Sequence, residues 1–322
     1  MKKTMRDAIR EAMAEELRRD PNVFLIGEDI GIYGGTLKVT DGLYAEFGPE
    51  RVIDTPISEN AITGAAIGAA MMGMRPVLEL MFGDFLYLAS DQLCNNAAKM
   101  RYAYDGKMSV PMVARAAYGG GSRSGMHHCQ NLEAVVAQCP GLKVVIPSNA
   151  YDAKGLLKAA IRDNDPVVFL EHKMLYGTRN EVPEEDYTVP IGKASIAREG
   201  RDVTIVCWGS MVPKAIKAAT TLSKEGIEAE VVDLRTIRPY DKTCIVQSVI
   251  KTSRLVVAHE ACLTGGFGGE IAAAVAKDAF GYLDGPIERV GAPDTPVPFS
   301  PALEDAFLPG EEEIIAAVKR TF

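Results

Sequence analysis

Residues 54–68 read DTPISENAITGAAIG. The acid Asp54 closes a short β-branched run, and a helix with almost no bulky polar side chains is expected to begin near Glu59. Gly64, Gly68 and the alanines around them allow another backbone to approach closely. The segment therefore predicts a strand, a loop and a helix that packs tightly within or between subunits.

Glu59 lies at the expected start of this helix, where a negative charge is favoured by the helix dipole. Ser58 and Glu59 are both suited to cap the helix. From these residues alone two interpretations stay open. Glu59 either only complements the dipole or is a carboxylate with a chemical role.

On both sides of this segment, β-branched runs alternate with helical patterns, which is typical of an α/β fold with a mainly parallel sheet. A polar, proline-bounded stretch between Leu175 and Pro190 interrupts the alternation, which restarts near Val203. We predict one domain over residues 1–185, a linker over 186–200 and a second α/β domain over 201–322.

The composition excludes several classes of protein. With 47% hydrophobic and 24% charged residues the chain is not disordered, and a net charge of -8 argues against a nucleic-acid partner. No apolar run approaches the ~20 residues that a membrane span needs. The amphipathic, acid-containing residues 1–20 do not resemble a signal or transit peptide, so a cytoplasmic protein or the mature form of an imported one is expected. Six dispersed cysteines without a C-x-x-C pair offer no zinc or iron–sulfur spacing.

Two glycine-rich loops are further candidates for chemistry. His127 and His128 follow the loop at 119–125, where an imidazole is suited to acid–base catalysis, although a surface histidine fits the pattern too. The neighbouring Cys129 is not expected to be a nucleophile. The loop at 265–269 opens a helix, so it either cradles a phosphate or forms a tight turn.

A series of motifs occurs in order along the chain. The motifs are Gly27-Glu28-Asp29, the 54–68 segment, Arg75–Phe82 with Asp84-Phe85, His128-Cys129-Gln130, Pro140–Val145, Asp152–Leu157 and Asp233–Thr236. With these motifs the chain resembles the beta subunit of the thiamine-diphosphate-dependent decarboxylating component of 2-oxo acid dehydrogenase complexes, a family that includes pyruvate, branched-chain 2-oxo acid and acetoin dehydrogenases.

The resemblance implies a pyrimidine-binding domain followed by a smaller transketolase C-terminal-like domain. It implies that Glu59 is the carboxylate that hydrogen-bonds a ring nitrogen of the cofactor's aminopyrimidine, with Phe85 beside the ring and Ile57 in backbone contact with it. An anionic acceptor at that nitrogen favours the imino tautomer, which can remove the thiazolium proton.

The same resemblance implies that His128 faces the substrate and later the lipoyl group. Glu28 and Tyr33 are expected at the same entrance. The turn at Asp163 matches a monovalent-cation site of some relatives, and the resemblance would place K⁺ there. A plain solvated turn is the alternative for these residues.

The chain contains no G-D-G motif, which thiamine enzymes use with paired asparagines to hold Mg²⁺ and diphosphate. The resemblance therefore implies a split active site. An alpha subunit would hold Mg²⁺ and the diphosphate in an assembly of two alpha and two beta chains, and the second domain would dock the dihydrolipoyl acyltransferase core.

We accordingly expect a dehydrogenase that oxidatively decarboxylates pyruvate or a similar 2-oxo acid, or cleaves acetoin, and transfers the acyl group to lipoamide. Leu88 and Cys129 depart from the usual family pattern and leave the substrate open. The alternatives are a branched-chain 2-oxo acid dehydrogenase, a single-chain NAD oxidoreductase that uses the 265–269 loop, and a non-catalytic scaffold subunit.

Overall fold

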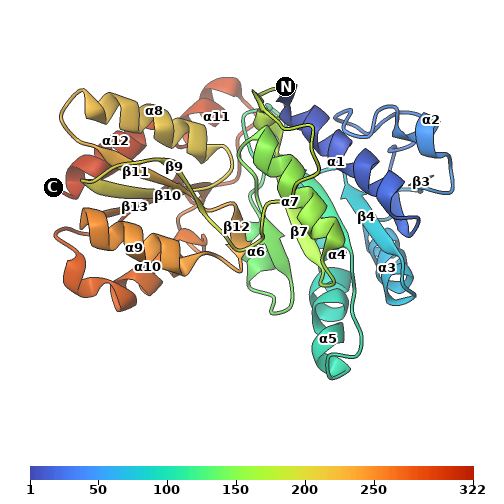
Figure 1. Ribbon diagram of the computed structural model, residues 1–322. Coiled ribbons are helices and arrows are strands. Elements are labelled where there is room, and N and C mark those ends of the chain that lie inside the picture. Colours follow the sequence, from blue (N-terminus) through green and yellow to red (C-terminus); the bar gives the residue numbers. More distant parts are fainter. The chain divides into compact units, whose positions relative to one another are not determined.

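The computed structural model describes the whole chain, Met1–Phe322, which divides into two packing units (Figure 1). Unit 1 comprises Met1–Tyr118 and Val135–Ile191, and unit 2 comprises Gly119–Ala134 and Gly192–Phe322. Each unit is an α/β structure with its own hydrophobic core. The predicted fold class, with mainly parallel sheets, is confirmed.

The sheet of unit 1 has the strand order β6-β7-β5-β4-β2-β3, and every one of these neighbouring pairs is parallel. Such strands end at a common edge, where loops lead into helices. The strands are β2 (Val23–Gly27), β3 (Val52–Asp54), β4 (Arg75–Leu80), β5 (Val113–Tyr118), β6 (Lys143–Val145) and β7 (Val167–His172).

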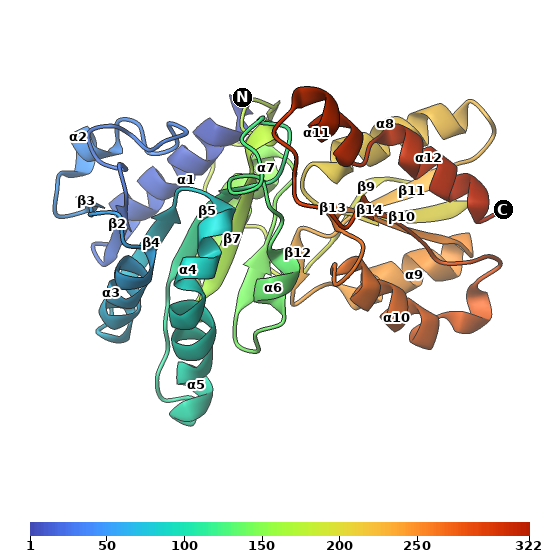
Figure 2. The ribbon, with the colours of Figure 1, turned by 180° about the vertical axis from the view of Figure 1, so that it is seen from behind.

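Helices cover both faces of this sheet. Helices α1 (Met5–Arg19) and α7 (Ala150–Arg162) cover one face (Figure 1), and α3 (Glu59–Met71) and α4 (Leu86–Ser90) cover the other (Figure 2). The short helices are α2 (Leu43–Phe47), α5 (Met100–Ala103) and α6 (Glu133–Ala137).

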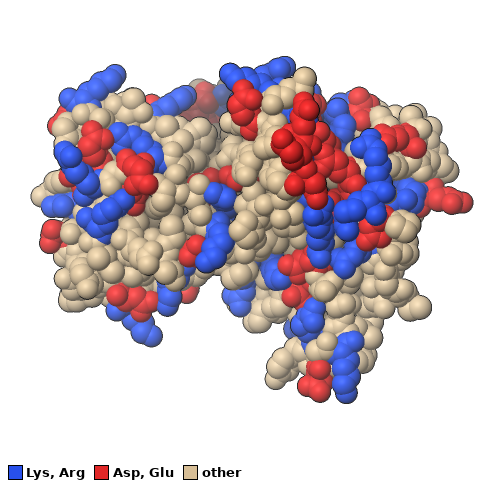
Figure 3. All heavy atoms as spheres, in the orientation of Figure 1, with Lys and Arg blue, Asp and Glu red and all other residues tan.

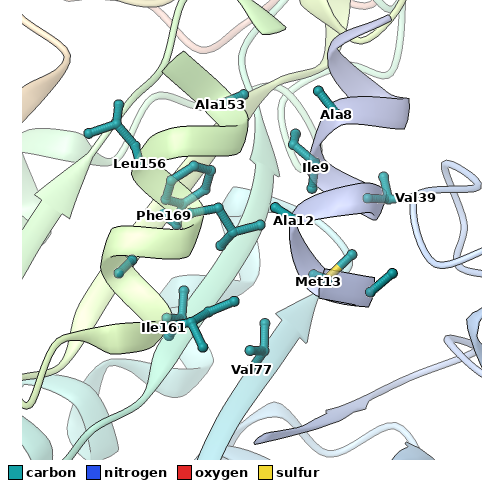
Figure 4. Close-up of a cluster of buried hydrophobic side chains, with 14 of the residues drawn as sticks. Ala8, Ile9, Ala12, Met13, Val39, Val77, Ala153, Leu156, Ile161 and Phe169 are labelled. Carbon is teal, nitrogen blue, oxygen red and sulfur yellow. The ribbon is translucent and has the colours of Figure 1, made fainter. Parts of the chain in front are cut away.

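The core of unit 1 lies between α1, α7 and the sheet (Figure 4). Apolar residues recur at helical spacing along α1, so one face of the helix is buried. Ile9 and Met13 of α1 pack with Leu156 of α7 and with Phe169 of β7, and all four side chains have 0% exposure. Thr4 accepts a hydrogen bond from the backbone N–H of Asp7 and thereby caps α1.

Ion pairs join the outer edges of α1 and α7, where acidic and basic side chains lie side by side (Figure 3). The ammonium of Lys154 is 2.7 Å from Glu15, and the guanidinium of Arg162 is 2.6 Å from Glu16. Lys158 also pairs with Glu15. Lys154 and Lys158 are buried at 0% and 1% exposure, so these partners neutralise charges that water does not reach.

Two parts of unit 1 differ from the sequence-based expectation. The expected long helix near 84–104 is broken by π-helical residues Asp91–Asn96 and by two 3₁₀ turns, Gly83–Phe85 and Ala97–Lys99. Asn96 donates its side-chain amide to the carbonyl of Asp91, and such side-chain bonds compete with regular helix bonds. The polar stretch between Leu175 and Pro190, for which no strand was predicted, contains β8 (Arg179–Glu181), which pairs antiparallel with β1 (Lys2–Thr4).

Unit 2 contains a second sheet with strand order β14-β13-β10-β11-β9, in which only β9 is antiparallel to its neighbour. Helices α8 and α12 lie on one face and α9 and α10 on the other (Figure 1). The elements of unit 2 are β9 (Ser195–Arg198), β10 (Val203–Cys207), α8 (Met211–Ser223), β11 (Ala229–Asp233), β12 (Thr236–Arg238), α9 (Lys242–Thr252), β13 (Leu255–Cys262), α10 (Gly268–Asp278), β14 (Glu288–Ala292), α11 (Pro301–Phe307) and α12 (Glu311–Arg320).

The packing units are not continuous segments. Residues 119–134, which we placed in the first domain, pack with unit 2, because backbone N–H groups of this segment donate to carboxylates of Glu260 and Glu304. The boundaries 1–185, 186–200 and 201–322 stay a prediction about the order of domains along the sequence. No helix combines the length and the apolar character that a membrane span requires.

Candidate active site

Two buried carboxylates lie at the carboxyl edge of the sheet of unit 1. Glu59 is the first residue of α3 and is 7% exposed, and Glu28 directly follows β2 and is 3% exposed. Glu28 accepts a 2.9 Å hydrogen bond from the backbone N–H of Ser58. Because β2 and β3 are parallel neighbours, the loops that follow them bring Glu28 to the start of α3.

The expected side-chain cap of α3 is not formed. Ser58 occupies the N-cap position but makes no capping hydrogen bond with its hydroxyl. Burial raises the pKa of Glu28, and the negative charges of Glu59 and Asp29 raise it further, whereas the Ser58 N–H opposes the shift. The helix N-terminus favours a negative charge on Glu59. Glu28 is therefore easier to protonate than an ordinary glutamate.

The other predicted residues of unit 1 occupy loops at the same sheet edge. Ile57 precedes Ser58 and is 77% exposed, an unusual exposure for an isoleucine beside buried carboxylates. Tyr33 lies in the loop after β2 and is 55% exposed, with the Lys38 ammonium 3.4 Å from its ring centroid. Phe85 ends the 3₁₀ turn after β4, and its ring packs edge-on against Phe82 with centroids 5.9 Å apart.

The loop after β2 is held by Asp54, the last residue of β3. The backbone N–H of Gly31 donates to Asp54 at 2.7 Å, and a Cβ at Gly31 would lie 2.3 Å from an oxygen of Asp54. Only glycine fits this approach. Our sequence analysis noted Asp54 as an acid after a strand but gave it no role.

A buried charge network that the sequence analysis missed lies within the same sheet. Arg115 of β5 forks onto Glu171 of β7 with distances of 2.7 and 2.8 Å, and it also reaches Glu79 of β4 at 2.7 Å. Tyr176 donates its hydroxyl to Glu171 at 2.7 Å. Burial raises the pKa of Glu79, and the charge of Arg115 opposes that rise. The sequence does carry one signal for this network: Arg115 stands in a strand whose other residues are apolar, and a buried arginine needs an acidic partner.

His128 belongs to unit 2, in the segment 119–134. His127 is exposed and His128 is half-buried. Cys129 is fully buried, in a small cluster with Ala292, Val297 and Phe307. This burial gives Cys129 a packing role.

The oxygens of the turn at Asp163 already have cationic protein partners. The Lys143 ammonium lies 2.6 and 2.8 Å from the two carboxylate oxygens of Asp163. The Arg75 guanidinium donates to the carbonyl oxygens of Asp163 and Ile161 at 2.9 and 3.0 Å. No group of three His, Cys, Asp or Glu side chains is arranged to hold a metal ion. The cation role of Asp163 stays a prediction.

Two glycines of the 265–269 loop, Gly266 and Gly268, are explained by packing. A Cβ at Gly266 or Gly268 would lie 2.6 Å from the ring of His259, so these glycines make room for the imidazole. Trp208 stacks on the same imidazole with centroids 5.4 Å apart and an interplanar angle of 15°. This contact supports the tight-turn interpretation of the loop.

Comparisons with known proteins show the family of this chain. Residues 1–179 match the family described as "Transketolase, pyrimidine binding domain", and residues 192–314 match "Transketolase, C-terminal domain". The chain is 52% identical over 324 residues to an acetoin:2,6-dichlorophenolindophenol oxidoreductase subunit beta of Cupriavidus necator, covering 98% of this chain and 96% of that protein. The chain belongs to this family of thiamine-diphosphate-dependent dehydrogenase beta subunits.

Further relatives in this beta-subunit family carry different substrate names. Two Bacillus subtilis proteins, a 2-oxoisovalerate dehydrogenase subunit beta and a pyruvate dehydrogenase E1 component subunit beta, are 48% and 47% identical, over 97% and 98% of this chain and 96% and 98% of theirs. A solved structure titled "Split gene transketolase, inactive beta4 tetramer" matches with a TM-score of 0.81 and 27% identity over 98% of this chain and 97% of that one. The recognised family, the transketolase-like fold and the oxidoreductase class are confirmed.

Proposed function

We propose that this chain completes the thiamine-diphosphate site of a dehydrogenase that oxidatively decarboxylates pyruvate or a similar 2-oxo acid, or cleaves acetoin, and passes the acyl group to lipoamide. The observation that supports this most is the position of Glu59. It is a buried carboxylate at the N-terminus of a helix, at the carboxyl edge of a parallel sheet, within a match to a pyrimidine-binding domain.

The residues present fit half of a thiamine diphosphate site. Glu59 would accept a hydrogen bond from a ring nitrogen, and its negative charge would favour the imino tautomer of the aminopyrimidine. Ile57 and Phe85 would contact the ring, and Glu28 and Tyr33 would line the entrance. When bound, the cofactor supplies the carbon nucleophile and the electron sink for cleavage beside the substrate carbonyl.

The exposed apolar surface around Glu59 supports a partner chain. Ile57 is 77% exposed, and Ile32, in the loop after β2, is 83% exposed. Exposed apolar groups beside a buried carboxylate are typical of a site that a second protein covers. That partner is an alpha subunit, which holds Mg²⁺ and the diphosphate in an assembly of two alpha and two beta chains in the cytoplasm.

His128 and unit 2 serve the second half of the reaction in this proposal. A half-buried imidazole at the end of a glycine-rich loop can hold or deliver a proton at the substrate oxygen and at the lipoyl sulfur. Unit 2 also docks the dihydrolipoyl acyltransferase core. The proposal also includes K⁺ at the Asp163 turn, where it would share the oxygens that Lys143 and Arg75 contact.

The test is Glu59→Gln in the chain co-purified with its alpha subunit. We expect turnover to fall by about 100-fold or more, the scale of a lost acid–base group, while assembly is unchanged. Glu312→Gln is the matched control, because Glu312 is an exposed glutamate in the first turn of α12. Full activity of Glu59→Gln would support the scaffold alternative, and NAD-dependent activity without a partner would support the single-chain oxidoreductase.

The substrate is decided by comparing pyruvate, 2-oxoisovalerate and acetoin in the same assembly. Selectivity between such substrates rests on a few pocket methylenes, each worth about 1–3 kcal/mol. A clear preference for 2-oxoisovalerate would establish the branched-chain alternative.

A further inference from the structure

The loop that carries His128 is tied to distant parts of unit 2 by two buried carboxylates. The backbone N–H of Gly120 donates to Glu260 at 2.7 Å. The N–H of Gly121 donates to one oxygen of Glu304 at 2.8 Å, and the N–H of Arg123 donates to its other oxygen at 3.1 Å. Glu304 belongs to α11 and has 0% exposure, so both of its oxygens serve this loop.

Helix α11 also holds the far end of the loop. Cys129, the residue after His128, packs in the same buried cluster as Phe307, the last residue of α11. At the near end, a Cβ at Gly120 would lie 2.7 Å from Leu308, the residue that follows the helix. His128 therefore lies on a short stretch of backbone between two anchors on one helix.

The charge of Glu304 is balanced by the loop itself. Arg123 donates from Nη1 to Glu304 at 2.9 Å and from Nη2 to Asp305 at 2.6 Å. A fully buried carboxylate is stable only when its oxygens are hydrogen-bonded and its charge is paired, and both conditions are met here by residues 121–123. The loop and the carboxylate thus hold each other in one arrangement.

We propose that Glu304 is a positioning residue for His128 and that it fixes the imidazole for acyl transfer. This inference rests on the proposed function, because that function gives His128 its role. Glu304 acts only through the backbone of residues 121–123, so its effect on the reaction exists only while His128 is present. Its neighbour Asp305 pairs with the same arginine, whereas the N–H groups of Gly121 and Arg123 donate to Glu304. Asp305 is therefore a matched control.

The test is a double-mutant cycle in the assembled enzyme, with lipoamide as acceptor and acyl-lipoamide measured by chromatography. Glu304→Gln replaces one acceptor oxygen by a donor that faces a loop N–H. We expect it to lower acyl transfer about ten-fold and His128→Asn about 100-fold. The double variant should match His128→Asn within about a factor of two, because residues that act as a unit are not additive. Asp305→Asn should stay within about two-fold of wild type.

Losses that multiply to about 1,000-fold in the double variant would overturn the inference, as would equal effects of Glu304→Gln and Asp305→Asn. Hydrogen exchange in the full-length chain gives a second readout, in which peptides from 119–129 should exchange at least about ten-fold faster in Glu304→Gln. Unchanged exchange would also overturn it. If Glu304→Gln does not fold, Glu304→Asp, which keeps the charge with a shorter reach, takes its place in both measurements. Faster exchange in a chain whose wild type shows no acyl transfer would refute the proposed function and leave the loop anchor standing.

Discussion

The carboxylate of Glu28 and the backbone N–H of Ser58 are joined by a 2.9 Å hydrogen bond that links the loop after β2 to the start of α3. This bond satisfies the backbone N–H of the N-cap residue itself, and it is separate from side-chain capping, which the hydroxyl of Ser58 does not provide for α3. It also places a second buried carboxylate beside Glu59, which raises the pKa of Glu28 in addition to the effect of burial.

Glu28→Ala should lower the free energy of unfolding by about 1–3 kcal/mol, because the Ser58 N–H loses its acceptor. Glu28→Gln keeps an acceptor oxygen and removes a charge that is costly in this environment, so its stability at pH 7.5 should equal or slightly exceed that of wild type. Urea unfolding of the three proteins measures the difference. Equal losses in both variants would contradict a role for the hydrogen bond.

Arg115→Met should lower the free energy of unfolding by about 3–5 kcal/mol, since it leaves the carboxylates of Glu79 and Glu171 buried without a cation. Arg115→Lys keeps a positive charge but cannot fork onto Glu171, so it should lose less than the methionine variant. Thermal unfolding compares the two. A methionine variant as stable as wild type would show that the network contributes no net stability.

Gly141→Ala should destabilise unit 1 by more than about 3 kcal/mol, because its φ is +102° and a Cβ would lie 1.9 Å from the carbonyl oxygen of Ala98. Gly106→Ala is the control. Its φ is +75°, but nothing lies within 4 Å of its Cβ position, so only the backbone strain of about 1 kcal/mol is expected. Similar unfolding temperatures for the two variants would show that the close approach at Gly141 relaxes at little cost.

Glu133 and His259, two buried groups of unit 2, should make opposite contributions to the pH dependence of its stability. Burial raises the pKa of Glu133 to about 7, so folded protein binds more protons than unfolded protein between about pH 4.5 and 7, and this contribution to stability is lost as the pH rises. Burial lowers the pKa of His259 to about 4, so its contribution is lost as the pH falls from about 6.5 to 4. In wild type the free energy of unfolding should therefore change little with pH between about 4.5 and 6.5, because the two contributions nearly cancel.

Glu133→Gln should remove the contribution of Glu133 to this pH dependence and leave the contribution of His259. The free energy of unfolding should then rise by about 3 kcal/mol from pH 4 to 6.5, because only His259 remains. His259→Gln should show the reverse slope. Trp208, the only tryptophan, donates to Glu133 at 3.2 Å and stacks on His259, so its fluorescence reports urea unfolding of unit 2 directly. Parallel pH profiles in wild type and Glu133→Gln would refute this pairing.

The residues of the 54–68 segment show how far sequence reasoning reached. A strand that ends at Asp54 and a helix that begins at Glu59 were both predicted and are both observed. The partner of Ser58 was not predicted, because Glu28 lies 30 positions away and only the parallel pairing of β2 with β3 brings it close. The antiparallel pair of β1 with β8 was missed for the same reason, since two three-residue strands carry no local pattern.

The sequence by itself determined the alternation of strands and helices, the buried face of α1 and the residues of the candidate site, because periodicity and motifs are local properties of the chain. Only the tertiary structure decided which groups meet. Glu304 reaches the His128 loop across 183 positions, and Arg115 reaches Glu171 across 56, contacts that no local pattern encodes. Both contacts follow from the packing within one unit. Each buried charge there needs a partner, and the folded backbone brings that partner within reach.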